Sequence, residues 1–342
     1  MDIVKIEDIL KREHEKPYRL KQIKRAIFVD LVDNWGEITT LPKELRQKLA
    51  KVCSFFDLRP EKILNSKDNQ AIKSLFILQD NLKIESVLMK HIDGRRTVCV
   101  SSQAGCPLAC KFCATGKQGF KRNLITSEII DQVLFFARLL KKEKEKITNI
   151  VFMGMGEPFL NYNNVLNSIK ILNDKEGFNL GARHFSISTA GIVDGIKKLS
   201  NEKLQINLAI SLHAPNNKLR TELMPINKNY PIEKVILAVK DYIKKTNRRV
   251  MFEYLMLDGI NDEEIHAKEL AIILKKYLDD LPYFVNLISY NPTSYLKFKH
   301  SPSKKIKKFK DILESLGIAV TQRYRFGEEI NAACGQLSGN NK

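Results

Sequence analysis

Three cysteines, Cys106, Cys110 and Cys113, stand within eight positions of the sequence. Their spacing, C-x3-C-x2-C, places three thiolates on one short loop. Three thiolates suit a cubic iron-sulfur cluster in which one iron has no protein ligand, because a fully ligated cluster takes four cysteines. An iron without a protein ligand can bind a further molecule. A structural zinc site is the alternative, but zinc spacings usually pair two cysteines with a second pair or with histidines, and His184 and His213 lack that arrangement.

Several predicted strands end in polar or glycine-rich segments. These segments are Gly154 to Pro158, Ser188 to Gly191, Ser211 to His213 and Tyr290 to Pro292. In a barrel of alternating strands and helices, such positions open onto the carboxyl-terminal face, where these folds build their active sites. A turn of the chain would explain each glycine alone. Their joint occurrence at successive strand ends, together with the cysteine loop, predicts a single pocket.

The elements that must position these residues repeat one unit from Thr97 onward, an apolar strand followed by a loop and an amphipathic helix. The candidate strands are Thr97–Ser101, Thr148–Met153, His184–Thr189, Ile206–Leu212, Val250–Leu257 and Tyr283–Ser289. Six units fall short of the eight that close a barrel. We therefore expect an α/β fold, a partial (β/α)6 barrel with an additional terminal strand over Ile318–Arg325.

The helix after the first strand has the clearest periodicity. Its apolar face consists of Ile129, Ile130, Val133, Phe136, Ala137 and Leu140. Thr126 and Ser127 precede this face and are the candidate N-cap residues.

Two smaller units are expected before the barrel. Residues 1–65 form a helical accessory module, because apolar residues recur at helical spacing there and Leu41-Pro42 introduces a further helix. Residues 66–96 form a β-hairpin extension with its turn at Gln79-Asp80-Asn81. The barrel and a carboxyl-terminal segment occupy residues 97–342.

Basic residues concentrate in two parts of the chain. In the helical module they are Lys16, Arg19, Lys21, Lys24 and Arg25. Near the carboxyl end they run from Lys297 to Lys308, beside an expected inward face of Ile306, Phe309, Leu313 and Leu316. Contact with RNA phosphates is the functional interpretation of both stretches, and a solvated helix face is the alternative.

Composition limits the class of protein. The 342 residues suffice for one catalytic core and a smaller module. With 57 Lys and Arg against 39 Asp and Glu, the formal charge is +18, which favours a polyanionic partner such as nucleic acid. Six cysteines, three of them in one loop, suit metal or redox chemistry in a reducing compartment. No stretch approaches the roughly 20 apolar residues of a membrane span, so we expect a cytoplasmic protein without membrane association.

The cysteine loop and the polar strand ends together resemble the radical S-adenosylmethionine superfamily. The resemblance implies one 4Fe-4S cluster on Cys106, Cys110 and Cys113, with S-adenosylmethionine chelating the open iron and being cleaved to a 5'-deoxyadenosyl radical. The cofactor-binding residues implied in the same way are Gly156, Glu157, Ser188, Ser211, Leu212, His213 and Asn291.

Further segments narrow the resemblance. They are Val98 to Cys106, Gly119 to Leu124, Ser211 to Pro215, Met224 to Asn227 and Ala332 to Leu337. Together they look like the RlmN/Cfr family of RNA adenine methyltransferases, and the match runs from about Leu20 to Leu337. Carbon 2 of adenine is electron-poor and has no usable nucleophilicity, so direct methyl transfer from a sulfonium would fail.

The family resemblance implies roles for three residues outside the cluster loop. Cys334 accepts a methyl group from one S-adenosylmethionine molecule, and a second molecule supplies the radical that activates this methyl group. Cys99 resolves the resulting protein–RNA adduct by forming a transient disulfide with Cys334, and Glu85 is the proton acceptor. Without the resemblance, Cys99 would be read as a small core residue and Glu85 as an exposed strand carboxylate. Cys53 matches no family motif and is interpreted as structural.

The resemblance also implies the substrate and the partners. The expected reaction is methylation of carbon 2 of adenosine 2503 in 23S ribosomal RNA, with adenosine 37 of transfer RNA as a further candidate. The expected electron donor is a flavodoxin or ferredoxin, and the expected state is a monomer. Methylation of carbon 8, as in the Cfr type, is the nearest alternative, and Pro158 favours the RlmN type. A radical enzyme acting on a small molecule and a non-catalytic RNA-binding protein with a structural metal site are the others.

Overall fold

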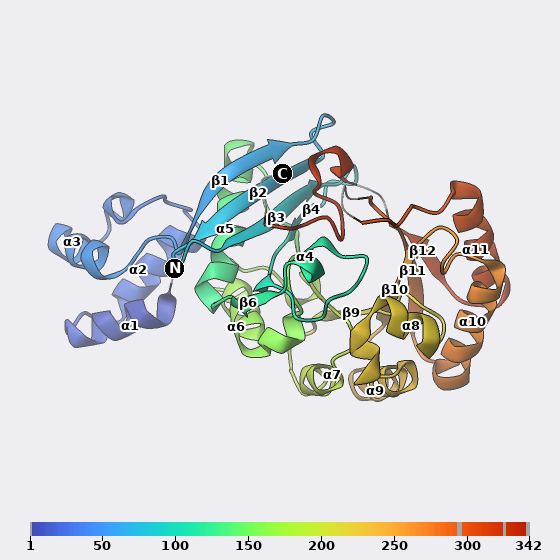
Figure 1. The fold of residues 1–342 in the computed structure, drawn as a ribbon. Helices are drawn as coiled ribbons and strands as arrows, with labels where there is room; N and C mark the ends of the chain where they lie inside the picture. Colours follow the sequence, from blue (N-terminus) through green and yellow to red (C-terminus); the bar gives the residue numbers. More distant parts are fainter. Residues whose placement is uncertain (1, 293–295, 324–325, 340–342) are drawn as a thin grey trace.

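The computed structural model describes residues 2–292, 296–323 and 326–339. Within them, ten strands form one sheet in the order β1-β2-β3-β4-β7-β8-β9-β10-β11-β12 (Figure 1). The strands are β1 Leu58–Asn65, β2 Ala71–Leu78, β3 Lys83–Lys90, β4 Arg96–Cys99, β7 Asn149–Phe152, β8 Phe185–Thr189, β9 Asn207–Ser211, β10 Val250–Met256, β11 Tyr283–Ser289 and β12 Val320–Gln322. A separate two-stranded sheet consists of β5 Gln103–Gly105 and β6 Phe120–Asn123.

The part of the sheet from β4 to β12 is parallel throughout. The helices of the β/α units are α5 Thr126–Lys142, α6 Tyr162–Asn173, α7 Val193–Leu199, α9 Ile232–Thr246, α10 Glu264–Leu278 and α11 Ser303–Ser315. The short helix α8, Asn217–Leu223, lies in the connection after β9. Each of the six predicted barrel strands lies within two residues of its observed bounds, and the predicted partial barrel is confirmed.

Two predictions at the carboxyl end differ from the structure. The terminal strand covers only Val320–Gln322 instead of Ile318–Arg325, and the last two positions of the predicted range lie outside the described residues. Leu316 is 38% exposed, because it caps the carboxyl end of α11 and does not continue the helix face. The remaining three residues of the predicted inward face are buried.

The predicted caps of α5 are also wrong. The helix begins at Thr126, so Thr126 and Ser127 lie in its first turn and Ile125 is the N-cap residue. The carboxylate of Glu128 accepts the backbone N–H of Ile125 at 3.0 Å. This carboxylate at the third helical position satisfies the backbone donor of the N-cap residue, as the glutamate of a capping box does.

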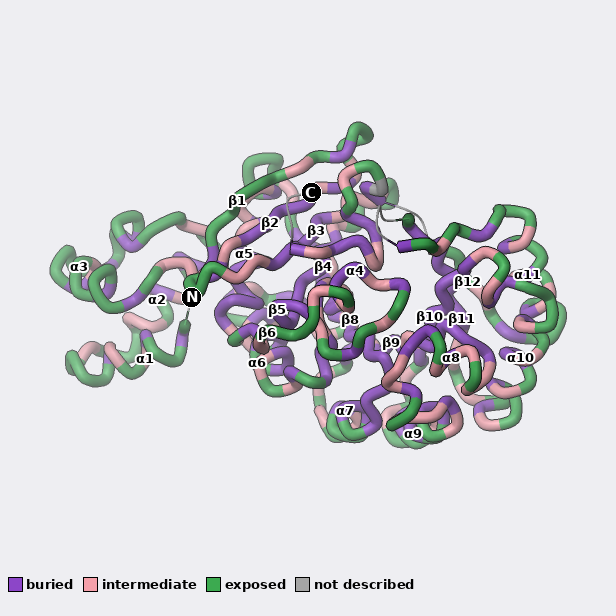
Figure 2. The backbone as a smooth tube through the Cα atoms, in the orientation of Figure 1, coloured by how far each residue is buried: buried purple, intermediate pink, exposed green. Residues whose placement is uncertain are grey.

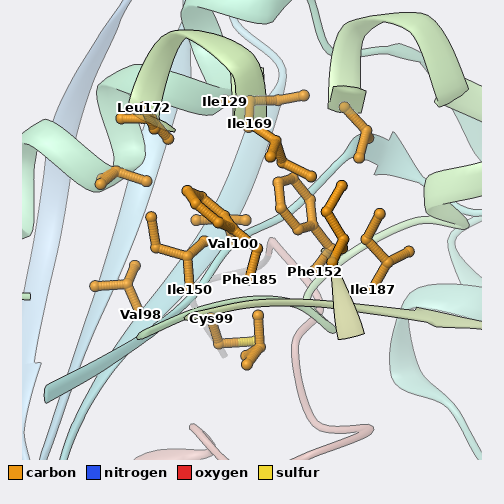
Figure 3. Packing of buried hydrophobic residues seen from close by; sticks show 14 of the residues in the cluster. Val98, Cys99, Val100, Ile129, Ile150, Phe152, Ile169, Leu172, Phe185 and Ile187 are labelled. Atoms are coloured by element: carbon orange, nitrogen blue, oxygen red, sulfur yellow. The ribbon is translucent and has the colours of Figure 1, made fainter. Parts of the chain in front are cut away.

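Alternation along the strands separates the core from the interior of the barrel. The strands are buried throughout the centre of the molecule (Figure 2). Val98 and Val100 pack with Ile129 and Ile169 on the side covered by α5 and α6, whereas Cys99 points to the opposite side, toward the carboxyl-terminal segment (Figure 3). A period of two along a strand produces this division, and it directs the Cys99 thiol into the barrel.

The hairpin extension has three strands rather than two. β2 and β3 pair antiparallel around the predicted turn, and β3 joins the barrel by pairing antiparallel with β4. Residues 58–65, expected in the helical module, form the edge strand β1, which pairs with β2. Most of β1 is exposed and its register shifts between Pro60 and Lys62. A proline and a bulge are tolerated at a sheet edge, and they conceal the alternation that normally reveals a strand.

The amino-terminal helices lie at one end of the molecule, as Figure 1 shows in blue. They are α1 Ile3–Arg12, α2 Tyr18–Phe28 and α3 Lys43–Val52. Two of the predicted basic residues form ion pairs with the segment after α6, Lys21 with Glu176 at 2.8 Å and Lys24 with Asp174 at 2.9 Å. These lysines therefore help to attach the helices to the barrel.

The single tryptophan of the chain, Trp35, is buried between these helices and the start of the sheet. Its indole N–H donates to the carbonyl oxygen of Cys53 at 3.0 Å, and its ring lies edge-on to Phe55 with 5.3 Å between ring centroids. Cys53 thus lies in the helical part of the molecule. None of the described helices is long and apolar enough to cross a membrane.

Candidate active site

The cysteine loop connects β5 to the one-turn helix α4, Ala114–Lys117. Gly105 precedes the loop with φ +77°, and a Cβ there would lie 1.9 Å from the carbonyl oxygen of Gly119, so no other residue fits. The backbone N–H of Lys111 donates to Leu223 of α8 at 2.9 Å, and that of Ala114 donates to Gly335 at 2.8 Å. The loop is therefore held between α8 and the carboxyl-terminal segment.

All three loop cysteines line one cavity of about 160 Å³, which we call the loop pocket. Its walls also include Gly156, Glu157, Ser188, Ser211 and His213 from the ends of β7, β8 and β9. Three of the four predicted strand-end segments thus meet in one cavity, and the fourth, Tyr290 to Pro292, does not line it. Two other residues of the predicted cofactor set lie elsewhere: Leu212 is fully buried in the core, and Asn291 lines a neighbouring cavity.

The donor set of the loop pocket fits an iron-sulfur cluster. Burial raises the pKa of Cys106 to about 12 and that of Cys110 well above its ordinary value, so both thiols need a bound cation to ionise at neutral pH. Among the described residues, no group of His, Cys, Asp and Glu side chains surrounds a single ion position. The three thiolates of a cubic cluster each bind a different iron, so they need not converge on one ion position.

The glycines after β7 allow that segment to pass close to the start of the cysteine loop. A Cβ on Gly154 would lie 2.7 Å from the carbonyl oxygen of Val100, and one on Gly156, where φ is +100°, would lie 2.5 Å from Cβ of Gln103. Both positions therefore require glycine because the two segments lie so close together, and not only because the chain turns there.

The Glu157 carboxylate connects the ends of two strands. One of its oxygens accepts the N–H of Phe159 at 3.0 Å and the other accepts the N–H of Ala190 at 2.8 Å. Burial raises the pKa of Glu157 to about 7. Because both carboxylate oxygens have backbone donors, the side chain fixes the shape of the pocket wall at β7 and β8.

His213 is a buried, neutral residue of the same wall. It has φ +59°, and its Nδ1 accepts the N–H of Leu255 at 3.1 Å. Burial lowers the pKa of His213 to about 3, and its ring lies edge-on to Phe112 of the cysteine loop at 5.1 Å. An Nδ1 that accepts places the ring proton on Nε2, so His213 can donate a hydrogen bond there without carrying charge.

A second cavity, of about 90 Å³, adjoins the loop pocket and is called the tail pocket here. Cys99 and Cys334 both line it, and Cys334 and Cys113 line both cavities. Burial raises the pKa of Cys99 to about 12 and also raises the pKa of Cys334. The two cysteines that are far apart in sequence thus share one small cavity beside the cluster loop, both as free thiols.

Asn291 supplies an unused hydrogen-bond acceptor to the tail pocket. Its Nδ2 donates to the carbonyl oxygen of Cys334 at 3.4 Å. Its Oδ1 is buried and has no hydrogen-bond partner within the described residues. A buried acceptor without a donor is costly in a folded protein, and a bound molecule with an N–H or O–H group would satisfy it.

Arg323 and Glu253 connect Cys334 to the serines of the loop pocket, and neither is among the site residues that the sequence predicts. Nη1 of Arg323 lies 3.3 Å from Sγ of Cys334 and 3.3 Å from a carboxylate oxygen of Glu253. The other oxygen of Glu253 accepts the hydroxyl of Ser188 at 2.7 Å, and Ser188 lies 3.2 Å from Ser211. The signal in the sequence is Glu253 itself, a carboxylate in the middle of an apolar strand.

The guanidinium of Arg323 lowers the pKa of Cys334 against the effect of burial. Arg323→Met is therefore expected to move the alkylation profile of Cys334 to higher pH, because the thiolate loses a neighbouring positive charge. At a pH below the pKa, the thiolate fraction falls about tenfold when the pKa of the thiol rises by one. Iodoacetamide labelling of cluster-free protein, followed by peptide mass spectrometry at Cys334 from pH 6 to about 10, measures this.

Two controls accompany this measurement. Arg323→Lys keeps a positive charge and should stay near the wild-type profile. Arg248→Met removes an arginine that pairs with Asn207 at the amino-terminal ends of the strands, and it should leave the profile unchanged. An Arg323→Met profile that coincides with wild type would show that this contact does not influence the thiol.

Glu85 lies under the carboxyl-terminal segment and does not line either cavity. It is 2% exposed, and one carboxylate oxygen pairs with Nζ of Lys73 at 3.0 Å. The other accepts the backbone N–H groups of Ser338 at 2.7 Å and of Gly339 at 3.2 Å. In this conformation the carboxylate binds the segment that carries Cys334.

Comparison with known proteins shows which class of enzyme this chain belongs to. Residues 100–271 match the model of the radical SAM superfamily. A crystal structure of a radical SAM methyltransferase from Sphaerobacter thermophilus superimposes with a TM-score of 0.96 at 42% identity, covering 99% of this chain and 98% of that one. The fold and the cysteine loop thus define a radical S-adenosylmethionine enzyme that holds a 4Fe-4S cluster and uses S-adenosylmethionine.

The sequence relatives define the family. Residues 1–55 match the ribosomal RNA large subunit methyltransferase N-terminal domain. A protein of Dictyoglomus thermophilum named probable dual-specificity RNA methyltransferase RlmN is 47% identical over 98% of this chain and 94% of its own length. One of the same name from Chloroflexus aurantiacus is 43% identical over 99% and 91%. The chain belongs to the RlmN family of radical S-adenosylmethionine RNA methyltransferases.

Proposed function

We propose that the enzyme methylates carbon 2 of adenosine 2503 in 23S ribosomal RNA through a methyl group carried on Cys334. The observation that carries the proposal is the position of Cys334, which lines both the loop pocket and the tail pocket and shares the latter with Cys99. A thiol placed in this way borders the cofactor site on one side and a second cysteine on the other. The names of the relatives support RNA as the substrate class.

The chain supplies two sulfur atoms because the target carbon cannot attack a sulfonium itself. The cluster, when bound, supplies the electron that cleaves S-adenosylmethionine to a 5'-deoxyadenosyl radical. Cys334 would take a methyl group from one cofactor molecule. The radical from a second molecule would remove a hydrogen atom from this methyl group, and the resulting carbon radical would bond to carbon 2 of the adenine. The adduct would then return one electron to the oxidised cluster and lose the ring hydrogen as a proton. The Cys99 thiolate then attacks the sulfur of Cys334, so that a disulfide forms, the bond between that sulfur and the methylene carbon breaks, and the carbon takes up a proton.

Cofactor contacts in this proposal come from both cavities. The residues assigned to it are Gly156, Glu157, Ser188, Ser211, Leu212, His213 and Asn291. The neutral His213 and the free acceptor of Asn291 are the groups best suited to new hydrogen bonds. Leu212 is fully buried, so only its backbone can contribute.

Glu85 remains the proposed proton acceptor for the ring hydrogen. Its carboxylate accepts the N–H groups of Ser338 and Gly339 in this structure. The proposal therefore requires the carboxyl-terminal segment to leave Glu85 when RNA binds. Lys73 pairs with the same carboxylate at 3.0 Å.

RNA recognition is assigned to the accessory units. We divide the chain into an amino-terminal helical module, a β extension that begins with β1 at Leu58, and the barrel of residues 97–342. The match of residues 1–55 to a ribosomal RNA methyltransferase domain supports the first assignment. A cytoplasmic monomer reduced by a flavodoxin or ferredoxin completes the proposal, with transfer RNA as a second substrate.

The basic stretch near the carboxyl end is less available to RNA than its sequence suggests. Lys305 contacts Asp258 at 3.1 Å and Glu263 at 2.9 Å, and Lys308 pairs with Glu264. These lysines connect α11 to the start of α10. Contact of this stretch with phosphates is therefore assigned only to its remaining lysines.

The position of methylation is tested on RNA from cells with and without the gene. Nuclease digestion and mass spectrometry of 23S ribosomal RNA should show 2-methyladenosine only when the gene is present. Appearance of 8-methyladenosine instead would overturn the proposal in favour of the Cfr-type reaction. Complementation with a Cys334→Ala gene is the control for RNA changes that do not depend on catalysis.

A further inference from the structure

Arg220 of α8 is the largest side chain among the fully buried residues, at 0% exposure. It uses its five N–H groups on the ends of neighbouring strands and on the turn after α8. The acceptors are the carbonyl oxygens of Leu212 at 3.2 Å, Tyr230 at 3.0 Å, Ala190 at 2.6 Å and Ser211 at 3.4 Å, and Oδ1 of Asn227 at 2.8 Å. The hydrogen-bonding capacity of the guanidinium is thereby filled.

All five acceptors are electrically neutral. Within the part of the chain that the structure describes, no carboxylate forms an ion pair with Arg220. The ionisable groups that interact electrostatically with it include the thiol of Cys110 and the ring of His213. A buried charge without a counter-charge is strongly unfavourable, and buried arginines are normally paired. Burial accordingly lowers the pKa of Arg220 to about 10.

The helix that carries Arg220, α8, packs against the cysteine loop. The carboxyl end of α8 contacts the cysteine loop directly, since Leu223 accepts the N–H of Lys111 at 2.9 Å. Leu223 and Met224 also pack in one apolar cluster with Leu108 and Phe112 of the loop. A cubic cluster whose core carries two positive charges and which is bound by three thiolates has one negative charge overall.

We infer that Arg220 is the counter-charge of the 4Fe-4S cluster, and that it raises the reduction potential of the cluster by favouring the state with one more electron. Net charge and surrounding charges are among the factors that set the potentials of such clusters. The inference depends on the cluster and not on the position of methylation or on Cys334. Arg220 touches carbonyl groups rather than the reacting atoms, so it is a positioning residue with an electrostatic effect.

Three variants of the full chain, reconstituted anaerobically with iron and sulfide, test the inference. Arg220→Met removes the charge, and Arg220→Lys keeps it with fewer hydrogen bonds. Arg138→Met is the matched control: Arg138 is a largely buried arginine that donates to the carbonyl oxygen of Val32 and lies over the ring of Phe56, at the amino-terminal end of the molecule. The readout is a redox titration followed by electron paramagnetic resonance, without S-adenosylmethionine or RNA.

Arg220→Met is expected to shift the midpoint potential to a more negative value, with Arg220→Lys and Arg138→Met close to wild type. A wild-type potential in Arg220→Met overturns the inference. If circular dichroism shows that Arg220→Met is folded although it binds no iron, the inference is supported when Arg220→Lys binds the cluster and has the wild-type midpoint potential. If Arg220→Lys matches Arg220→Met in iron content and potential, hydrogen bonding alone explains the residue and the inference fails.

Discussion

Cys110→Ala protein, purified without oxygen and supplied with iron and sulfide, is expected to remain colourless, with an almost complete loss of bound iron. The thiol of Cys110 is one of three proposed ligands on a single loop, and a cubic cluster held by two thiolates would leave two irons open to solvent. No 5'-deoxyadenosine should form on reduction with S-adenosylmethionine. Iron and sulfide analysis, visible absorbance and chromatography of the cofactor products measure the three effects.

The chain contains a matched control for this substitution. Cys53 is 5% exposed and lies at the end of α3, where its carbonyl oxygen, not its thiol, accepts the indole N–H of Trp35. Cys53→Ala should therefore keep the brown cluster and the activity. A Cys110→Ala protein with wild-type iron content would contradict the assignment of the cluster ligands.

The second large expected effect concerns the two cysteines of the tail pocket, whose replacement by alanine should have different consequences. Cys334→Ala should abolish both methylation of the protein and the modified nucleoside, because no sulfur remains to carry the methyl group. Cys99→Ala should still methylate Cys334 but accumulate a covalent protein–RNA adduct, because the neighbouring thiol that would release it is missing. Denaturing gels with labelled RNA, and intact-protein mass spectrometry, distinguish the two outcomes.

These variants also control for each other. Both remove a thiol from the same cavity, so a general loss of packing should affect them alike, at about 1 kcal/mol or somewhat more. Opposite effects on adduct formation cannot come from packing. Repeated turnover of Cys99→Ala at the wild-type rate would refute the resolving role of Cys99, and modified RNA from Cys334→Ala would refute the methyl carrier.

The parallel barrel and the cluster loop could be predicted from the sequence because both depend on local patterns. Buried parallel strands are mostly apolar, as in Val250–Met256, where Glu253 is the exception. They alternate with amphipathic helices whose period can be recognised in the sequence. The cysteine loop carries the three proposed cluster ligands within one short segment. The pocket followed from topology, since the ends of parallel strands share one face of the barrel.

Other features depend on contacts between distant segments and could not be predicted in this way. The strand β1 has an exposed, proline-containing sequence, and only its pairing with β2 makes it a strand. The interaction of Arg323 with Cys334 joins residues from a loop and a tail, and the burial of Arg220 depends on four different strand and turn carbonyls. The partners of Glu85 lie about 250 positions away, at residues 338 and 339.

The protein has two optical signals in different places, the fluorescence of Trp35 and the colour of the iron centre. Its indole is the only one in the chain and lies at the junction of the amino-terminal helices with the sheet, against Phe55. Ultraviolet emission therefore monitors that junction, while the visible colour of the iron centre monitors the cysteine loop. Rearrangement of the helices when a nucleic acid docks can thus be followed in the same cuvette as damage to the iron centre, without any added dye.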